Sequence, residues 1–154
     1  MKIEKNKFDT LANIFCLLLL IGVSLYLFVS WDKLPQEVPG HYNGAGEADI
    51  ISSKDSLIFP LVVAWILFIG LTIIERYPQI WNTGVTVTEK NRERVYRTLK
   101  NMLNTIKLIL TVIFSYTIIN SSLGLNLSPY FLPAFLLLIF GTLILYGVIL
   151  VKSK

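Results

Sequence analysis

Apolar residues fall into four runs, and each run is long enough to cross a membrane. The runs cover residues 10–30, 56–75, 103–122 and 131–151, and none has an ionisable residue near its middle. A helix needs roughly 20 apolar residues to span the hydrocarbon core of a bilayer, and its backbone groups must be paired within the segment. The pattern therefore predicts an all-α integral membrane protein, with four transmembrane helices in one domain over residues 1–154.

The composition supports this class and excludes an ordinary soluble domain. Hydrophobic residues make up 54% of the chain, charged residues only 16%, and the mean hydropathy is +0.63. Soluble chains are typically about 45–50% apolar and about 25% charged. Most charged and special residues lie in two polar stretches between the runs, residues 31–55 and 76–102.

Lysine and arginine are unevenly distributed between the connecting segments. They cluster before the first run, within residues 76–102 and at the C-terminal end, whereas residues 31–55 contain only Lys33 and Lys54. The positive-inside rule then predicts a multi-pass protein of a cell membrane, with both termini and residues 76–102 cytoplasmic and residues 31–55 extracellular. The net charge of +4 is attributed to this topology, and direct binding to nucleic acid is not expected.

Residues 31–55 have the residue types of an ordered loop that presents a site. The two prolines exclude a regular helix, Asn43-Gly44 is a turn signal, and three glycines permit sharp turns and close backbone approach. Such a preorganised loop suits recognition of a peptide or lipid outside the membrane. The residues predicted to form this ligand site are Trp31, Pro35, Pro39, His41, Tyr42, Asn43, Gly46, Asp49 and Lys54.

The same loop raises the alternative of a cation site. His41, Glu47 and Asp49 supply one imidazole and two carboxylates. Zinc usually takes three or four nitrogen or sulfur donors, and hard cations prefer several oxygens, but this spacing matches no standard motif. No cofactor is therefore expected. A divalent cation is the alternative, and a third interpretation is that His41 hydrogen-bonds within the loop and holds its fold.

Residues 76–102 predict a basic amphipathic helix that leads into the third span. Val95, Leu99 and Met102 recur at helical spacing among arginines, and Thr86–Glu89 fits a capping box. The basic side is expected to face anionic headgroups, with a cytoplasmic regulator as the alternative partner. The predicted contact residues are Glu89, Asn91, Arg92, Arg94, Tyr96 and Arg97.

Ionisable residues at the edges of the spans have simple interpretations. Asp9 or Thr10 is placed to cap the first span. Glu75 and Lys107 lie near the edges of the second and third spans, so they are expected to snorkel to the membrane surface rather than to relay protons.

Two ordered motifs carry a family resemblance. Residues 31–54 read W-x-x-L-P-x-x-V-P-x-H-Y-N-x-x-G-x-x-D-x-x-x-S-K, and residues 81–96 read W-x-x-x-V-x-V-T-E-x-N-R-x-x-x-Y. Together they resemble a bacterial membrane domain of unknown function that also occurs at the N-terminus of SdpI-type immunity proteins. The resemblance implies a bacterial cell membrane protein, and it places both motifs in the family's two loops.

The leading functional hypothesis is a non-enzymatic sensor or immunity-type protein. It would recognise a membrane-active peptide or lipid through residues 31–55 and pass occupancy to lipid or a cytoplasmic partner through the basic helix. Two alternatives stay open. One is a metal-dependent enzyme at the outer leaflet, with His41 and Asp49 as ligands and Glu47 as base. The other is a small structural subunit of a membrane complex.

Overall fold

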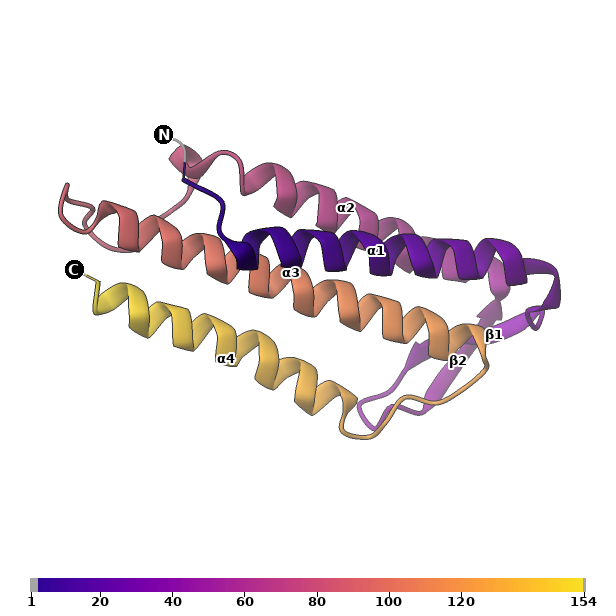
Figure 1. Ribbon diagram of the computed structural model, residues 1–154. Coiled ribbons are helices and arrows are strands. Elements are labelled where there is room, and N and C mark those ends of the chain that lie inside the picture. The colour runs from indigo at the N-terminus through magenta and orange to yellow at the C-terminus, as the bar shows by residue number, and fades with distance from the viewer. Residues whose placement is uncertain (1–2, 154) are drawn as a thin grey trace.

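A computed structural model describes residues 3–153, which form four long helices and a small β-hairpin (Figure 1). The helices are α1 (Lys7–Ser30), α2 (Ile58–Ile74), α3 (Arg92–Ser122) and α4 (Phe131–Val151). The strands are β1 (Glu37–Tyr42) and β2 (Ala48–Ser53), and short 3-10 turns occur at η1 (Trp31–Lys33), η2 (Lys54–Leu57) and η3 (Pro78–Ile80).

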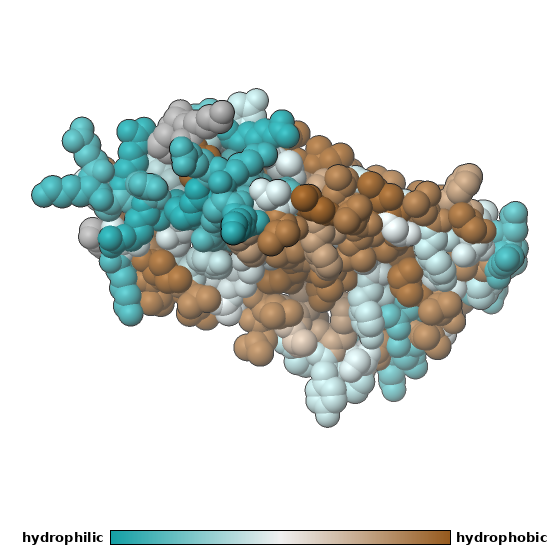
Figure 2. Space-filling view, in the orientation of Figure 1, coloured by the Kyte–Doolittle hydropathy of each residue, from teal (hydrophilic) through white to brown (hydrophobic). Residues whose placement is uncertain are grey.

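All four helices are long and apolar enough to cross a membrane, which confirms that each predicted run forms a helix of spanning length. Most of their apolar side chains point outward, and Figure 2 shows an apolar band between polar residues at the two ends of the molecule. Such a surface suits lipid rather than water. The fold is that of a multi-pass membrane protein, and the side of the membrane on which each end lies stays a prediction.

Helix α3 is the centre of the bundle. Helices α1, α2 and α4 each pack against α3, whereas α1 and α2 touch one another only slightly. The start of α1 and the end of α4 lie together at one end, and the β-hairpin lies at the other (Figure 1). The first of these two ends contains residues 76–100 and is called the basic end. The other contains residues 31–57 and 123–130 and is called the hairpin end.

The hairpin corrects the all-α prediction. Strands β1 and β2 pair antiparallel, with Glu37 opposite Ser53 and Tyr42 opposite Ala48, and the register is irregular around His41. Proline at position 39 excludes a helix but is compatible with an irregular edge strand. The predicted loop is ordered, as expected, but its order comes from strand pairing.

The N-termini of α1 and α3 differ from the predicted caps. Asn6, rather than Asp9 or Thr10, caps α1, and Asp9 completes a capping box by accepting the Asn6 N–H. Before α3, Thr88 and Asn91 bond each other's backbone N–H groups, so the predicted Thr86–Glu89 box is wrong. The Asn91 side-chain oxygen accepts the Thr88 N–H, the bond that the glutamate of a capping box would accept, although asparagine is one methylene shorter.

The basic helix and the third span are one continuous helix, as predicted. Helix α3 has 31 residues, or about 46 Å at 1.5 Å per residue. Val95 and Leu99 are buried with Leu150 of α4 and pack against the partly buried Trp81. This apolar cluster holds residues 81–87 against α3 and α4 at the basic end.

Candidate functional site

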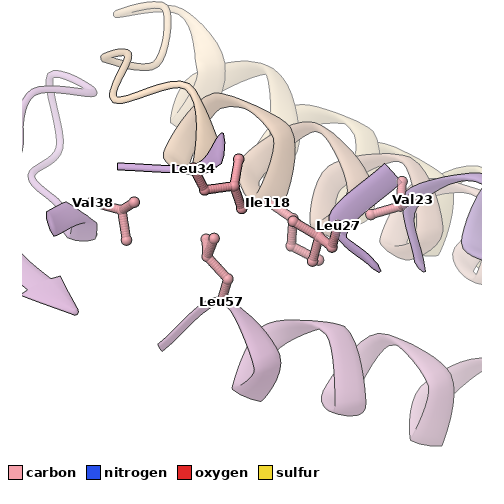
Figure 3. Close-up of a cluster of buried hydrophobic side chains, with 6 residues drawn as sticks. All are labelled: Val23, Leu27, Leu34, Val38, Leu57 and Ile118. Carbon is pink, nitrogen blue, oxygen red and sulfur yellow. The ribbon is translucent and has the colours of Figure 1, made fainter. Parts of the chain in front are cut away.

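The hairpin is anchored in the mouth of the bundle by apolar side chains. Val38 of β1 is fully buried, and Leu34 precedes it at 8% exposure. They join Leu57 and residues of α1 and α3 in one cluster (Figure 3). The remaining members are Val23, Leu27 and Ile118. Burying side chains of this size stabilises by roughly 1.5–3 kcal/mol each, so the hairpin is held as part of the core.

The turn of the hairpin is built by Asn43. Its side-chain oxygen accepts the N–H groups of Ala45 (2.9 Å) and Glu47 (3.0 Å), and its amide donates to the Glu47 carboxylate at 3.1 Å. The predicted turn is confirmed, but the left-handed position is Gly46, with φ of +84°, rather than Gly44. Asn43 is thus engaged within the loop.

Gly46 fits against the loop between α3 and α4. Its carbonyl accepts the Leu127 N–H at 2.8 Å, and a Cβ at this position would lie 2.6 Å from the Leu127 carbonyl oxygen. Beside it, the Ala48 N–H donates to the Asn126 side chain at 2.9 Å. The close backbone approach expected of the loop glycines is therefore present here. It fastens the hairpin to a segment that is distant in sequence.

Two more polar contacts fasten β1 to the same region. The buried Ser121 hydroxyl donates to the Pro39 carbonyl, and the Tyr42 hydroxyl donates to the Leu125 carbonyl at 3.0 Å. Burial raises the pKa of the Tyr42 hydroxyl above its usual value, so the group remains a donor. Pro39 and Tyr42 therefore hold the hairpin in place.

His41 and Asp49 form a pair on the exposed surface of the hairpin. The His41 Nδ1 and Asp49 Oδ1 atoms are 2.6 Å apart, and their side chains are 61% and 41% exposed. Both strands contribute, since His41 lies in β1 and Asp49 in β2. The pair fits the interpretation that His41 hydrogen-bonds within the loop, and it presents a polar group to an approaching molecule.

The three candidate metal ligands do not converge. Glu47 bonds with Asn43 instead of joining His41 and Asp49. Within residues 3–153, no three His, Cys, Asp or Glu side chains are grouped closely enough to hold a metal ion. The donor set thus lacks the third ligand that a zinc or calcium site requires.

Trp31 and Lys54 close the base of the loop. The Lys54 ammonium donates to the Trp31 carbonyl at 3.1 Å and lies 5.3 Å from the centre of its ring. The Lys54 N–H also donates to the Gln36 carbonyl at 2.9 Å. Both residues thus join the ends of the segment, and Pro35 is exposed beside them.

A cleft of about 410 Å³ lies between the hairpin and the ends of α2 and α3. Tyr42 and Pro39 form its hairpin side, and Phe59 and Ile118 contribute from the helices. Phe59 is 75% exposed, so the cleft has an open apolar margin. The other lining residues are Gly40, Ser56, Leu57, Pro60, Thr117 and Ser121.

At the basic end, the predicted contact residues separate into two groups. Three are exposed: Glu89, Arg92 and Arg94. The other three are buried or half-buried: the Asn91 side chain accepts the Thr88 N–H, and the ring of Tyr96 lies 6.0 Å from that of Trp81. Arg97 donates to Asp9 at 2.8 Å. The exposed three remain the predicted contacts with lipid or a partner.

A cluster of buried polar side chains lies between α1, α2 and α3 near the basic end. The Lys107 ammonium is 2.8 Å from Glu75 Oε2, 2.8 Å from Asn13 Oδ1 and 3.2 Å from Thr72 Oγ1. Glu75 is 9% exposed and Lys107 is 1% exposed. The prediction that they snorkel to the surface is therefore wrong. An unpaired charge is costly to bury, so each has its partner inside the bundle.

The cluster continues to the start of α1 through Asp9, which is 1% exposed. Lys100 lies 3.0 Å from Asp9 and 3.7 Å from Glu75, so it links the carboxylates of α1 and α2 through α3. The Asn104 amide also donates to Asp9 at 3.1 Å. Polar contacts of this kind fix the relative positions of helices where apolar packing alone permits sliding.

The sequence does contain a signal for this cluster. Polar residues recur along α3 every three or four positions, which places them on one face of the helix. The mean hydropathy of the segment hides this polar stripe, because the residues of the opposite face are strongly apolar. The members of the stripe are Arg97, Lys100, Asn104, Lys107, Thr111 and Ser115, all buried except the half-buried Arg97.

Comparison with known proteins supports part of the family resemblance. Residues 17–64 match the family model described as "Domain of unknown function (DUF1648)", from α1 across the hairpin into α2. An uncharacterized protein of Archaeoglobus fulgidus is 32% identical over 66 residues, which cover 38% of this chain and 36% of the relative. The matched part is thus about a third of that protein's length. No solved structure matches the chain significantly.

Proposed function

We propose that this protein is a non-enzymatic membrane receptor, of sensor or immunity type, that recognises a cationic membrane-active peptide at its hairpin end. The observation that carries the proposal is the apolar cleft beneath the hairpin, at an end of the molecule whose exposed charges are mostly acidic. A membrane-active peptide has an apolar face and a cationic face. The cleft is complementary to the apolar face, and the acidic side chains are complementary to the cationic face.

The apolar part of the site is well placed for such a peptide. The cleft opens where α2 and α3 end, at the level at which a bilayer gives way to water if these helices span it. Ile50 and Ile51 of β2 are 55% and 57% exposed nearby and extend the apolar surface of the hairpin. An amphipathic peptide lying at the interface meets this surface without leaving the membrane.

The charge at the hairpin end favours a cationic ligand over an anionic lipid. Residues 31–57 contain five acidic residues and two lysines, a net charge of −3 without histidine. One of the lysines, Lys54, is engaged with Trp31. The acidic side chains are all exposed: Asp32, Glu37, Glu47, Asp49 and Asp55. A field of this sign attracts cations and repels anionic headgroups.

The hairpin is also held rigidly before any ligand arrives. Its contacts with the core and with the loop between α3 and α4 fix the cleft and the His41–Asp49 pair in one arrangement. A preorganised site loses little conformational entropy on binding, so a small cleft suffices for useful affinity.

The test is binding of a synthetic amphipathic Leu/Lys peptide to the full-length protein in phosphatidylcholine nanodiscs. The double variant Glu47→Gln/Asp49→Asn is expected to weaken binding and to reduce its salt dependence, because it removes exposed charge. Phe59→Ala is expected to weaken binding with the salt dependence unchanged. Glu89→Gln/Glu93→Gln, which removes two exposed carboxylates at the basic end, is the charge-matched control.

Two outcomes count against the receptor proposal. Equal binding by Glu47→Gln/Asp49→Asn and by Glu89→Gln/Glu93→Gln means that the peptide does not use the hairpin end. If hairpin variants lower stability while no peptide binds and cells lacking the protein keep normal sensitivity to membrane-active peptides, the structural-subunit alternative is favoured.

A further inference from the structure

A second apolar opening lies at the basic end, between α1 and α2. It is a crevice of about 250 Å³ whose walls are formed by Ile14 and Leu17 of α1 and Phe68 of α2. Lys5 and Arg76 line the same crevice, and Asn13, Thr72 and Glu75 complete it. The crevice exists because α1 and α2 each pack on α3 and scarcely touch one another.

The crevice continues to the polar surface of the basic end. A larger space of about 880 Å³ adjoins it and shares Lys5, Glu75 and Arg76 as lining residues. Its other lining residues are Ile3, Glu4, Pro78 and Lys100. An opening that is apolar along the helices and basic near their ends has the polarity profile of a phospholipid.

Lys5 and Arg76 differ from the other basic residues nearby. Arg97, Lys100 and Lys107 are paired with the carboxylates of Asp9 and Glu75. Lys5 and Arg76 are exposed, and neither side chain has a hydrogen-bond or ion-pair partner within residues 3–153. The buried carboxylates are already neutralised, so Lys5 and Arg76 outweigh the exposed Glu4 of the adjoining space and leave a net positive charge at the crevice.

We infer that this crevice is a binding site for one anionic phospholipid. The headgroup with its anionic phosphate lies between Lys5 and Arg76, and an acyl chain lies against Ile14, Leu17 and Phe68. Basic pockets between transmembrane helices bind anionic headgroups in this way. The inference is independent of peptide recognition at the hairpin end.

The charge of the basic end excludes the ligand proposed for the hairpin end. Residues 76–100 contain six basic and two acidic residues, a net charge of +4, which repels a cationic peptide. A free phosphate ion makes no use of the apolar walls. A phospholipid satisfies both the charge and the walls, and the four apolar helices indicate that lipid surrounds the crevice.

The experiment is native mass spectrometry of the full-length protein, delipidated in mild detergent and titrated with phosphatidylglycerol or phosphatidylcholine. The wild type is expected to retain one phosphatidylglycerol with a preference of roughly tenfold over phosphatidylcholine. Lys5→Gln/Arg76→Gln is expected to lose that preference. Leu17→Trp, which fills the crevice, is expected to weaken binding of both lipids.

The matched control is Lys90→Gln/Arg94→Gln, which removes the same charge from the same end but outside the crevice. Retention of the preference in this control, with loss in Lys5→Gln/Arg76→Gln, supports the site. The same loss in both double variants indicates diffuse attraction and overturns it. Equal binding of the two lipids by the wild type also overturns it. Circular dichroism of each variant verifies that the helices are retained.

Discussion

Replacing Gly46 by alanine tests whether the hairpin is held by its backbone contact with the loop between α3 and α4. Two costs add at this position. The φ of +84° is in the left-handed region, where an L-residue with a Cβ pays about 1–2 kcal/mol. The new Cβ would also lie 2.6 Å from the Leu127 carbonyl oxygen, which is backbone and cannot rotate away.

The hairpin must therefore shift and lose the hydrogen bond from the Leu127 N–H to the Gly46 carbonyl. A hydrogen bond of this kind contributes about 0.5–1.5 kcal/mol. The expected total is about 2–3 kcal/mol, which corresponds to roughly a 30- to 150-fold increase in the open population of the hairpin. Hydrogen exchange of the β1 and β2 amides in detergent measures this opening directly.

Gly44→Ala is the matched control, two residues earlier in the same turn. Gly44 has no positive φ, and a Cβ there would meet only the Leu132 side chain, at 3.9 Å. Its expected effect is within about 0.5 kcal/mol. If Gly46→Ala opens the hairpin no more than Gly44→Ala does, the close backbone contact does not hold the hairpin and the reasoning fails.

Three further predictions concern the buried cluster, the hairpin contact and the topology. Lys107→Met leaves Glu75 buried with only the more distant Lys100, so we expect the free energy of unfolding to fall by roughly 3–5 kcal/mol in thermal or denaturant unfolding. Adding Glu75→Leu should restore most of this stability. A loss no smaller in the double variant would show that the ion pair is not the cause. Ser121→Ala leaves a β1 carbonyl without its buried donor and should cost about 1–3 kcal/mol, measured as faster amide exchange in β1, and unchanged exchange would contradict it. A Glu47→Cys variant in intact cells should react with a membrane-impermeant maleimide while Arg94→Cys should not, and the reverse pattern would invert the predicted topology.

The number, length and class of the spans could be predicted from the sequence. Runs of about 20 apolar residues have one stable form in lipid, because backbone groups there must be paired within the helix. Residues 131–151 show this well, since the predicted span and α4 have the same limits. The turn at Asn43 was equally predictable, because its side chain builds the turn from local contacts alone.

The chemistry of the site was less predictable, because it depends on which distant residues meet. His41 and Asp49 come together through strand pairing, and the loop between α3 and α4 supplies the contacts that fix Gly46. The sequence predicts that Lys107 snorkels from a span edge, yet Lys107 lies beside Glu75 between three helices. The local sequence pattern predicts where a residue lies along a helix and on which face, but it does not predict which residue of another helix it contacts.

The sequence by itself thus determined that this protein has four helices long and apolar enough to span a membrane, with an ordered polar segment after the first of them. Those properties follow from the partition of individual residues between water and hydrocarbon, which depends on local composition. The tertiary structure alone decided that a buried charge network joins α1, α2 and α3, and that apolar openings lie at both ends of the bundle. These properties arise from packing, in which residues remote in the chain neutralise or leave room for one another.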